Sequence, residues 1–287
     1  MFLVTGITGN VGGAAARHLL EKGKQVRALV RDEAKAAAWA SKGVELVKGA
    51  WEDPAAIARA LDGVEGAYLM MPPITTPSPD FREAKAIIAS YKEALATSAP
   101  PRLVALSSMG SEKSSGLGLI TSTYLFEQAL IDEPFPIAFV RAGSFYENYL
   151  FGLQAGLSGT LPSFYSPTDF KLPMIGTEDI GAEVARLLTS EWTGKRFIEL
   201  GSMASADDLA TELGVVLGRD VKAQAIPRET WAGALQQMGL PAGQTWGYEE
   251  MIEGVSSGWI GFDVEGTERV EGTTSAREVF AAASGAK

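Results

Sequence analysis

The sequence contains no cysteine and a single histidine, His18, among its 287 residues. The absence of cysteine excludes disulfides, thiolate-bound metals and a cysteine nucleophile. One histidine is too few for the usual histidine-based metal sites, and its position in the first expected helix marks it as a surface or packing residue rather than a member of a Ser-His-Asp triad. We therefore expect no metal centre in this protein.

Long apolar runs are also missing. No stretch approaches the roughly 18 apolar residues of a membrane-spanning helix, and no basic segment precedes the apolar Met1–Val4 as it would in a secretory signal. A chain without cysteine is typical of a reducing compartment. We expect a cytoplasmic protein that does not enter a membrane.

Positive charge is scarce outside the N-terminal part of the chain. The net charge is −10, and residues 151–287 hold ten Lys/Arg against nineteen Asp/Glu. Such a surface repels nucleic acid, which we do not expect as a partner. Residues 1–50 hold eight Lys/Arg against four Asp/Glu, so a small anionic ligand is compatible with the N-terminal part.

Short apolar segments alternate with helical patterns over the first half of the chain. The segments expected as strands are bounded by Gly, Pro or polar residues and are rich in Val, Leu and Ile: Phe2–Gly6, Gln25–Val30, Val44–Gly49, Gly66–Met71, Arg102–Ser107 and Pro136–Arg141. The segments between them are expected as helices: Val11–Lys22, Glu33–Ser41, Pro54–Leu61, Phe81–Thr97 and Ile120–Ile131. This order predicts an α/β fold, a Rossmann-type doubly wound parallel sheet with helices on both faces.

The alternation weakens after about residue 143. We expect a helix at Thr177–Ser190, a strand at Arg196–Gly201, a helix at Ala206–Leu217 and a helical segment at Pro227–Gly261. Residues 1–150 are accordingly predicted to form an NAD(P)-binding domain, to which the strand near 196–201 also belongs. Residues 151–287 are predicted to form a small α/β substrate-binding lobe that is not an independent domain.

The first strand runs directly into a glycine-rich turn, Thr5-Gly6-Ile7-Thr8-Gly9-Asn10-Val11-Gly12. Gly6 permits a tight turn, Gly9 permits close approach of a pyrophosphate, and Gly12 lets the following helix pack near the sheet. The free N–H groups at the helix start then attract phosphate. We predict a dinucleotide site formed by Gly6, Thr8, Gly9, Asn10, Val11 and Gly12.

The second strand ends in Val30-Arg31-Asp32. An acidic residue here suits the ribose hydroxyl of NAD, whereas an arginine suits the 2′-phosphate of NADP. Because Arg31 comes first, we favour NADP and keep NAD as the alternative.

Several of these stretches resemble the NmrA-like family of atypical short-chain dehydrogenases/reductases. The resemblance includes the glycine turn, Leu106–Gly110, Glu127–Leu130, Arg141–Asn148 and Glu178–Gly181, and it extends over nearly the whole chain. It implies an NAD(P)-binding Rossmann domain with a small C-terminal lobe. It also implies that Met70, Met71 and Pro72 lie beside the nicotinamide ribose. The family contains NADPH-dependent quinone, azo and enone reductases and also non-catalytic redox sensors.

Two positions depart from that family. Ala50 stands where many members have an aspartate that binds the adenine amino group, so we expect adenine to rest on Trp51 or to accept less specific contacts. The family's His-x-x-x-Glu segment has Thr123 in place of the histidine.

Candidate catalytic residues follow the fifth expected strand. Typical short-chain dehydrogenases use a serine and Tyr-x-x-x-Lys, in which the ammonium lowers the pKa of the phenol. Here Tyr124 is followed at i+4 by the neutral Gln128, which makes Tyr124 a poor base but a possible hydrogen-bond donor to a carbonyl. Ser107 and Ser108 can polarise the same carbonyl, and Ser107 also counts among the expected cofactor contacts. Glu127 and Glu147 are interpreted as structural carboxylates.

Aromatic residues are concentrated after residue 143. We expect Phe145, Tyr146, Asn148 and Tyr149 to form the wall of a substrate pocket. Trp231 and Trp246, with Met251 and Trp259, are expected to close it from the lobe. Core packing remains the alternative for each of them.

These residues favour an NADPH-dependent oxidoreductase that reduces a quinone or another aromatic or conjugated carbonyl by direct hydride transfer, acting as a monomer or homodimer. The alternative is a redox sensor that binds NAD(P) without turnover and acts through a protein partner. The missing lysine favours the sensor, and the aromatic residues after 143 favour the enzyme.

Overall fold

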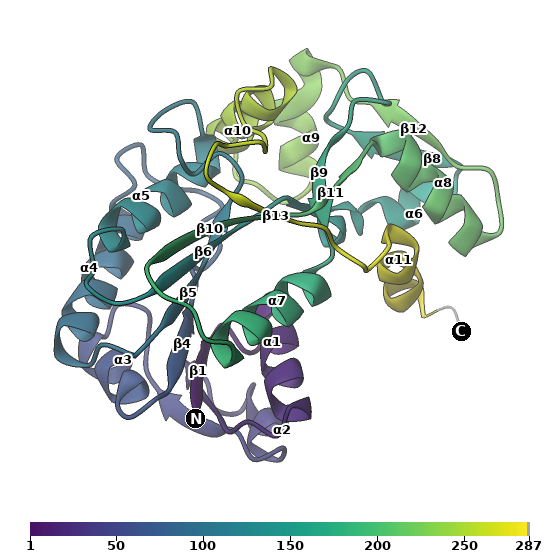
Figure 1. The fold of residues 1–287 in the computed structure, drawn as a ribbon. Coiled ribbons are helices and arrows are strands. Elements are labelled where there is room, and N and C mark those ends of the chain that lie inside the picture. Colours follow the sequence, from purple (N-terminus) through teal and green to yellow (C-terminus); the bar gives the residue numbers. More distant parts are fainter. Residues whose placement is uncertain (286–287) are drawn as a thin grey trace.

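In the computed structural model, which describes residues 1–285, one large sheet forms the centre of the molecule (Figure 1). The final two residues of the expected lobe, 286–287, lie outside the described residues. The sheet has eight strands in the order β13-β10-β6-β5-β4-β1-β2-β3, and every pair of neighbours is parallel. Its strands are β1 (Phe2–Thr5), β2 (Val26–Val30), β3 (Glu45–Lys48), β4 (Gly66–Leu69), β5 (Leu103–Ser108), β6 (Ile137–Ala142), β10 (Lys195–Leu200) and β13 (Glu268–Val270). The predicted Rossmann-type parallel sheet is confirmed.

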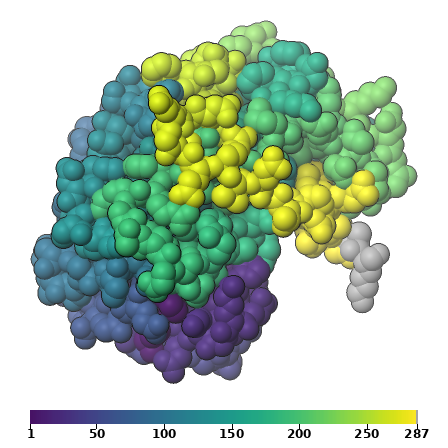
Figure 2. Space-filling view, viewed as in Figure 1, coloured from purple at the N-terminus to yellow at the C-terminus, as the bar shows by residue number. Residues whose placement is uncertain are grey.

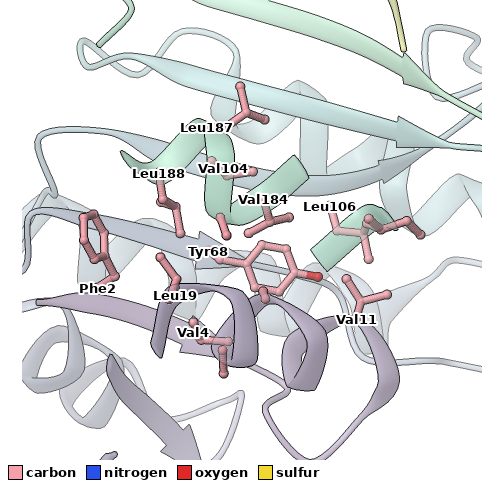
Figure 3. Close-up of a cluster of buried hydrophobic side chains, with 14 of the residues drawn as sticks. Phe2, Val4, Val11, Leu19, Tyr68, Val104, Leu106, Val184, Leu187 and Leu188 are labelled. Atoms are coloured by element: carbon pink, nitrogen blue, oxygen red, sulfur yellow. The ribbon is translucent and has the colours of Figure 1, made fainter. Parts of the chain in front are cut away.

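Helices cover both faces of this sheet. One face packs against α1 (Asn10–Glu21) and α7 (Thr177–Thr189), and the other against α3 (Pro54–Leu61), α4 (Arg82–Thr97) and α5 (Thr121–Leu130). Alternation along β1 explains the two cores, because Phe2 and Val4 enter the first and Leu3 the second. Figure 3 shows the first core, where Tyr68 lies between side chains of α1 and α7.

The strand expected at Arg196–Gly201 is β10, which pairs with β6 inside the large sheet. Helix α7 and strand β13 also pack with this sheet, so three elements from the second half of the chain belong to it. The predicted boundary at residue 150 divides the chain in sequence, but β10, β13 and α7, which all follow it, pack with the N-terminal strands.

The remaining C-terminal elements build a lobe beside the carboxyl ends of the strands (Figure 1). It contains a three-stranded sheet and a two-stranded sheet: β7 (Ser144–Phe145), β9 (Leu172–Ile175) and β11 (Ser202–Ala204), then β8 (Thr160–Ser163) and β12 (Lys222–Ala225). Its helices are α6 (Gly152–Gly156), α8 (Ala206–Leu217), α9 (Trp231–Gln237), α10 (Trp246–Ser256) and α11 (Ala276–Ser284). In Figure 2 the C-terminal segment, in yellow, runs across the visible face of the molecule, and Figure 1 shows that this segment includes β13 and α11.

Two predicted helices differ from the structure. The segment expected at Glu33–Ser41 is helical only in α2 (Ala37–Ala40), because Asp32 accepts a hydrogen bond from the Ala34 amide and residues 33–36 form turns. The helical segment expected at Pro227–Gly261 is divided into α9 and α10. The chain between them includes Gly239, at φ +102°, and Pro241, both of which oppose a continuous helix.

Helix α7 lies against α1, and its Asp179-Ile180-Gly181 segment explains the contact. A Cβ on Gly181 would lie 2.6 Å from the backbone nitrogen of Ala15, so only glycine lets the two helices approach this closely. Asp179 accepts hydrogen bonds from the amides of Thr273 and Thr274, which ties the C-terminal segment to α7. This segment thus joins the N-terminal helix, the sheet and the chain end.

Glu147 supplies the cap that the sequence of α7 lacks. The N-cap residue is Gly176, which has no side chain to accept a bond from the first turn. Glu147 Oε1 instead accepts from the Thr177 amide at 2.9 Å and from its hydroxyl at 2.5 Å. This geometry agrees with the interpretation of Glu147 as a structural carboxylate.

Among the described residues, no helix is long and apolar enough to cross a membrane.

The packing of α7 on α1 predicts a large effect of a single added methyl group. Gly181→Ala is expected to lower the free energy of unfolding by about 2–3 kcal/mol, because the methyl overlaps α1. Gly233→Ala in α9 is the matched control, since nothing lies within 4 Å of its added Cβ, and it should be neutral or stabilising by about 0.5–1 kcal/mol. Urea unfolding followed by circular dichroism measures both, and equal effects would contradict the packing argument.

Candidate active site

The glycine turn connects β1 to α1 at the carboxyl edge of the sheet. Gly6 has φ +67°, a left-handed conformation that glycine adopts freely, and the Gly9 amide donates to the Gly6 carbonyl at 2.9 Å. A Cβ on Gly12 would lie 2.6 Å from the Thr5 carbonyl oxygen, so the first turn of α1 lies directly against the end of the strand. The backbone therefore uses Gly6 and Gly12 in the way that the sequence predicted.

The start of α1 keeps its backbone donors available. Gly9 is the N-cap and offers no side-chain acceptor, and the first turn contains no acidic residue. Asn10, Val11 and Gly12 line the adjacent cavity. Free N–H groups and the positive end of the helix dipole together make an anion site, which suits a pyrophosphate.

Thr5 fixes the wall opposite this turn. Its hydroxyl donates to the Tyr68 carbonyl at 3.1 Å and accepts from the Met70 amide at 3.2 Å, so it joins β1 to the chain beyond the end of β4. Tyr91 donates to the Met70 carbonyl at 2.9 Å. These bonds hold Met70 beside Gly6, and Met71 and Pro72 line the same cavity.

Two cavities together form one cleft along the sheet edge. The first, of about 440 Å³, extends from the glycine turn to the end of β2, and the second, of about 470 Å³, continues to β5, β6 and α7. They share Gly6, Thr8, Arg31 and Trp51. The structure brings all the residues predicted for the cofactor to this cleft: Gly6, Thr8, Gly9, Asn10, Val11, Gly12, Arg31, Trp51, Met70, Met71, Pro72 and Ser107.

The far end of the cleft holds two positive charges and one negative charge. Arg31, Lys35 and Asp32 all line it, and neither cationic side chain makes an ion pair or hydrogen bond within residues 1–285. The Asp32 carboxylate accepts from the Ala34 amide at 3.0 Å and so belongs to a local turn. The sequence prediction did not include Lys35. Its position four residues after Arg31 could have indicated a second cation at this end of the cleft.

Ser107 is tied to a buried ion pair. Its hydroxyl donates to Glu127 at 2.6 Å, and Arg141 binds both oxygens of the same carboxylate at 2.9 and 2.7 Å. All three residues are buried. Burial raises the pKa of Glu127, and the hydrogen bonds from Arg141 and Ser107 oppose that rise. Glu127 therefore has the structural role expected of it. The Ser107 hydroxyl already donates its hydrogen bond to Glu127 and is not free to donate to a substrate.

Ser108 differs from its neighbour. It also lines the cleft, but its side-chain hydroxyl has no hydrogen bond within the described chain. Tyr124, the other candidate, is partly buried against the lobe core, whereas the adjacent Thr123 lines the cleft. The Thr123 hydroxyl donates to the Ile120 carbonyl at 2.8 Å. The hydroxyls of Ser108 and Tyr124 both lack a partner within the described residues, but of these two only Ser108 lines the cleft.

An apolar cavity of about 360 Å³ lies between the cleft and the lobe. Ser144 lines it, while the flanking Gly143 and Phe145 line the cleft, so both spaces border the same short segment. No charged side chain is among the described residues that line this cavity: Leu119, Ser144, Asn148, Tyr149, Phe151, Phe164, Tyr165, Leu235, Met238, Tyr248, Met251 and Ile252.

The phenols of this cavity stay neutral. Burial raises the pKa of Tyr149 to about 12, and it also raises the pKa values of Tyr165 and Tyr248. They can therefore offer hydroxyl hydrogens to a ligand without adding charge.

Of the pocket residues predicted besides the tryptophans, Asn148, Tyr149 and Met251 line the apolar cavity, and Phe145 lines the cleft. Tyr146 is buried and lines neither space.

The tryptophans expected to close the pocket lie elsewhere, which corrects that expectation. Trp231 is buried edge-on to Phe164 and donates to the Ile226 carbonyl at 2.9 Å. Trp246 packs edge-on against Phe81, with ring centroids 5.8 Å apart. Trp259 is 48% exposed and donates to the Ser115 carbonyl. Their indoles serve packing between segments rather than the cavity wall.

Within the described part of the chain, no group of His, Asp or Glu side chains could hold a metal ion.

The known proteins that are similar to this chain include several that are named as reductases or oxidoreductases. Quinone oxidoreductase 2 of Escherichia coli is 29% identical over 248 residues, which cover 85% of this chain and 84% of that protein. The (4-alkanoyl-5-oxo-2,5-dihydrofuran-3-yl)methyl phosphate reductase of Streptomyces griseus is 32% identical over 228 residues, covering 77% and 76%. The crystal structure of the Escherichia coli NADPH-dependent quinone oxidoreductase complexed with NADPH superimposes with a TM-score of 0.79 at 27% identity and covers 98% of this chain and 99% of that one.

The glycine turn, the Asp-Ile-Gly contact and the cleft are thus found in a chain whose residues 1–253 match the NmrA-like family, and the protein belongs to that family.

Proposed function

We propose that this protein is an NADPH-dependent reductase of quinones or other uncharged conjugated carbonyl compounds. The observation that carries the proposal is the segment Gly143–Phe145, which borders both a cleft suited to a dinucleotide and an apolar cavity without charged side chains among its described lining residues. Of the relatives named above, the quinone oxidoreductase supports the quinone class, while the dihydrofuran reductase supports reduction of a conjugated carbonyl compound that carries a phosphate.

The residues of the cleft fit NADPH along its whole length. The start of α1 would bind the pyrophosphate, and Arg31 with Lys35 would bind the 2′-phosphate. Met70, Met71 and Pro72 would contact the nicotinamide half. NADPH, when bound, supplies a hydride.

The residues beside the nicotinamide end of the cleft need only to stabilise the negative charge that forms on the substrate. Negative charge that develops on a quinone oxygen is delocalised, so one well-placed hydrogen-bond donor is sufficient to stabilise it. Ser108 provides a free hydroxyl in the cleft, and the neutral phenols of the apolar cavity provide further donors. The apolar wall excludes water and orients the ring. No strong base is required, which accommodates Gln128 in place of lysine.

The first experiment is NADPH and NADH oxidation against quinones, enones and aromatic ketones, with cofactor binding measured in parallel. Turnover with one of these classes would support the reductase. Tight cofactor binding without turnover across the panel would overturn it and favour the redox sensor that acts through a protein partner.

Cofactor selection is predicted to depend on the cationic end of the cleft. Arg31→Ala and Lys35→Ala should each weaken NADPH binding about tenfold or more, because each removes a charge-assisted contact to the 2′-phosphate. NADH binding should change little. Arg59→Ala, an exposed arginine outside the cleft, is the control. Calorimetric titration with both cofactors measures the effect, and equal losses for NADPH and NADH would contradict the assignment.

The choice between the candidate donors can be tested in one series. Ser108→Ala is expected to lower kcat at least about tenfold with cofactor affinity intact, because a transition-state hydrogen bond is lost. Tyr124→Phe should leave kcat nearly unchanged, since its side chain packs against the lobe core. The opposite ranking in steady-state kinetics would return the role to Tyr124.

A further inference from the structure

A second apolar cavity continues from the first toward the surface. Its volume is about 290 Å³, and it lies between the loop after β4, at Thr75 and Thr76, and the turn after α9, at Gly239–Pro241. It shares three lining residues with the 360 Å³ cavity, namely Leu235, Met238 and Tyr248. We call the 360 Å³ space the inner cavity and this one the outer cavity.

The order of the spaces follows from their lining residues. The inner cavity is lined by Ser144, which lies between the cleft residues Gly143 and Phe145, and it shares Leu235, Met238 and Tyr248 with the outer cavity. A ligand whose reactive ring lies next to the cleft would therefore direct any substituent on its far side into the outer cavity.

The chemistry of the outer cavity is apolar as well. Its described lining contains Leu235, Met238, Leu240 and Pro241 with two threonines, a glycine and one tyrosine, and no charged side chain. A phosphate or carboxylate there would lose its hydration without gaining a cation. A hydrocarbon substituent would instead gain about 0.8 kcal/mol for each buried methylene.

The side chains that line both cavities include one that can change its shape around a ligand. Met238 is 47% exposed although it contributes to both cavities, and an unbranched methionine changes shape easily around a ligand. Leu235 is only 1% exposed, so its position is fixed by packing. A hydrocarbon chain needs less room between Leu235 and Met238 than a second ring system does.

We propose that the inner and outer cavities form one two-part site, which takes an uncharged conjugated ring in the inner part and its flexible hydrocarbon tail in the outer part. The inference rests on the proposed function, because it places the reactive ring of that substrate in the inner cavity. Leu240, which lines only the outer cavity, then belongs to the tail subsite.

The test compares 1,4-benzoquinone with hexyl-1,4-benzoquinone as substrates. The wild-type protein is expected to show kcat/KM at least about tenfold higher for the tailed quinone, since several methylenes leave water. Leu240→Trp fills the outer cavity and should lower the ratio of kcat/KM between tailed and tailless quinone about tenfold. Val215→Trp, at a residue 54% exposed in α8, is the matched control and should leave the ratio unchanged.

Binding is measured separately by calorimetry with the two quinones in the presence of NADP⁺, so that turnover is not needed. Tail-dependent binding that Leu240→Trp abolishes would support the two-part site even if no NADPH were consumed, in which case only the proposed function would fall. Turnover with equal kcat/KM and equal affinity for both quinones would overturn the two-part site and leave the reductase intact. A tail preference that Leu240→Trp does not change would also overturn it.

Discussion

The close approach of α1 to the backbone around it is the constraint on which the rest of this structure depends. Gly12 lets the first turn of the helix lie against the end of β1, and Gly181 lets α7 lie against the same helix on the same face of the sheet. A side chain at either glycine would overlap backbone atoms. The N-terminus of α1 is thereby held at the carboxyl edge of the sheet, where its unpaired N–H groups face the cleft.

A second constraint acts at the other side of the cleft. The buried carboxylate of Glu127 requires strong partners, and it obtains them from Arg141 on β6 and Ser107 on β5. Successive residues of a strand point in opposite directions, so Ser108 escapes this network. Two adjacent serines that both line the cleft consequently differ in hydrogen bonding, because one hydroxyl donates to Glu127 and the other has no partner among the described residues.

The lobe contributes a different kind of surface. Its cavities contain phenols, thioethers and aliphatic side chains but no charges among the described lining residues. The positive charge of the site is concentrated at Arg31 and Lys35, at the end of the cleft away from the lobe. The charged part of the site and the apolar cavities are thus lined by different residues on either side of Gly143–Phe145.

The sequence by itself determined the parallel sheet, the glycine turn and the residues around the start of α1 that line the cleft, because all three depend on neighbours in the chain: strand alternation, turn geometry and the start of the next helix. It also indicated Arg31, which ends a strand.

The tertiary structure decided what depends on packing between distant segments. It joined β13 to the large sheet beside the predicted strand β10, and it used Trp231 and Trp246 for packing instead of the pocket wall. It also separated Ser108 from Ser107 through a glutamate 20 residues away from Ser107 in the chain. Side-chain type states what a residue can do, but only the partners brought by folding decide which of its hydrogen bonds and faces remain free.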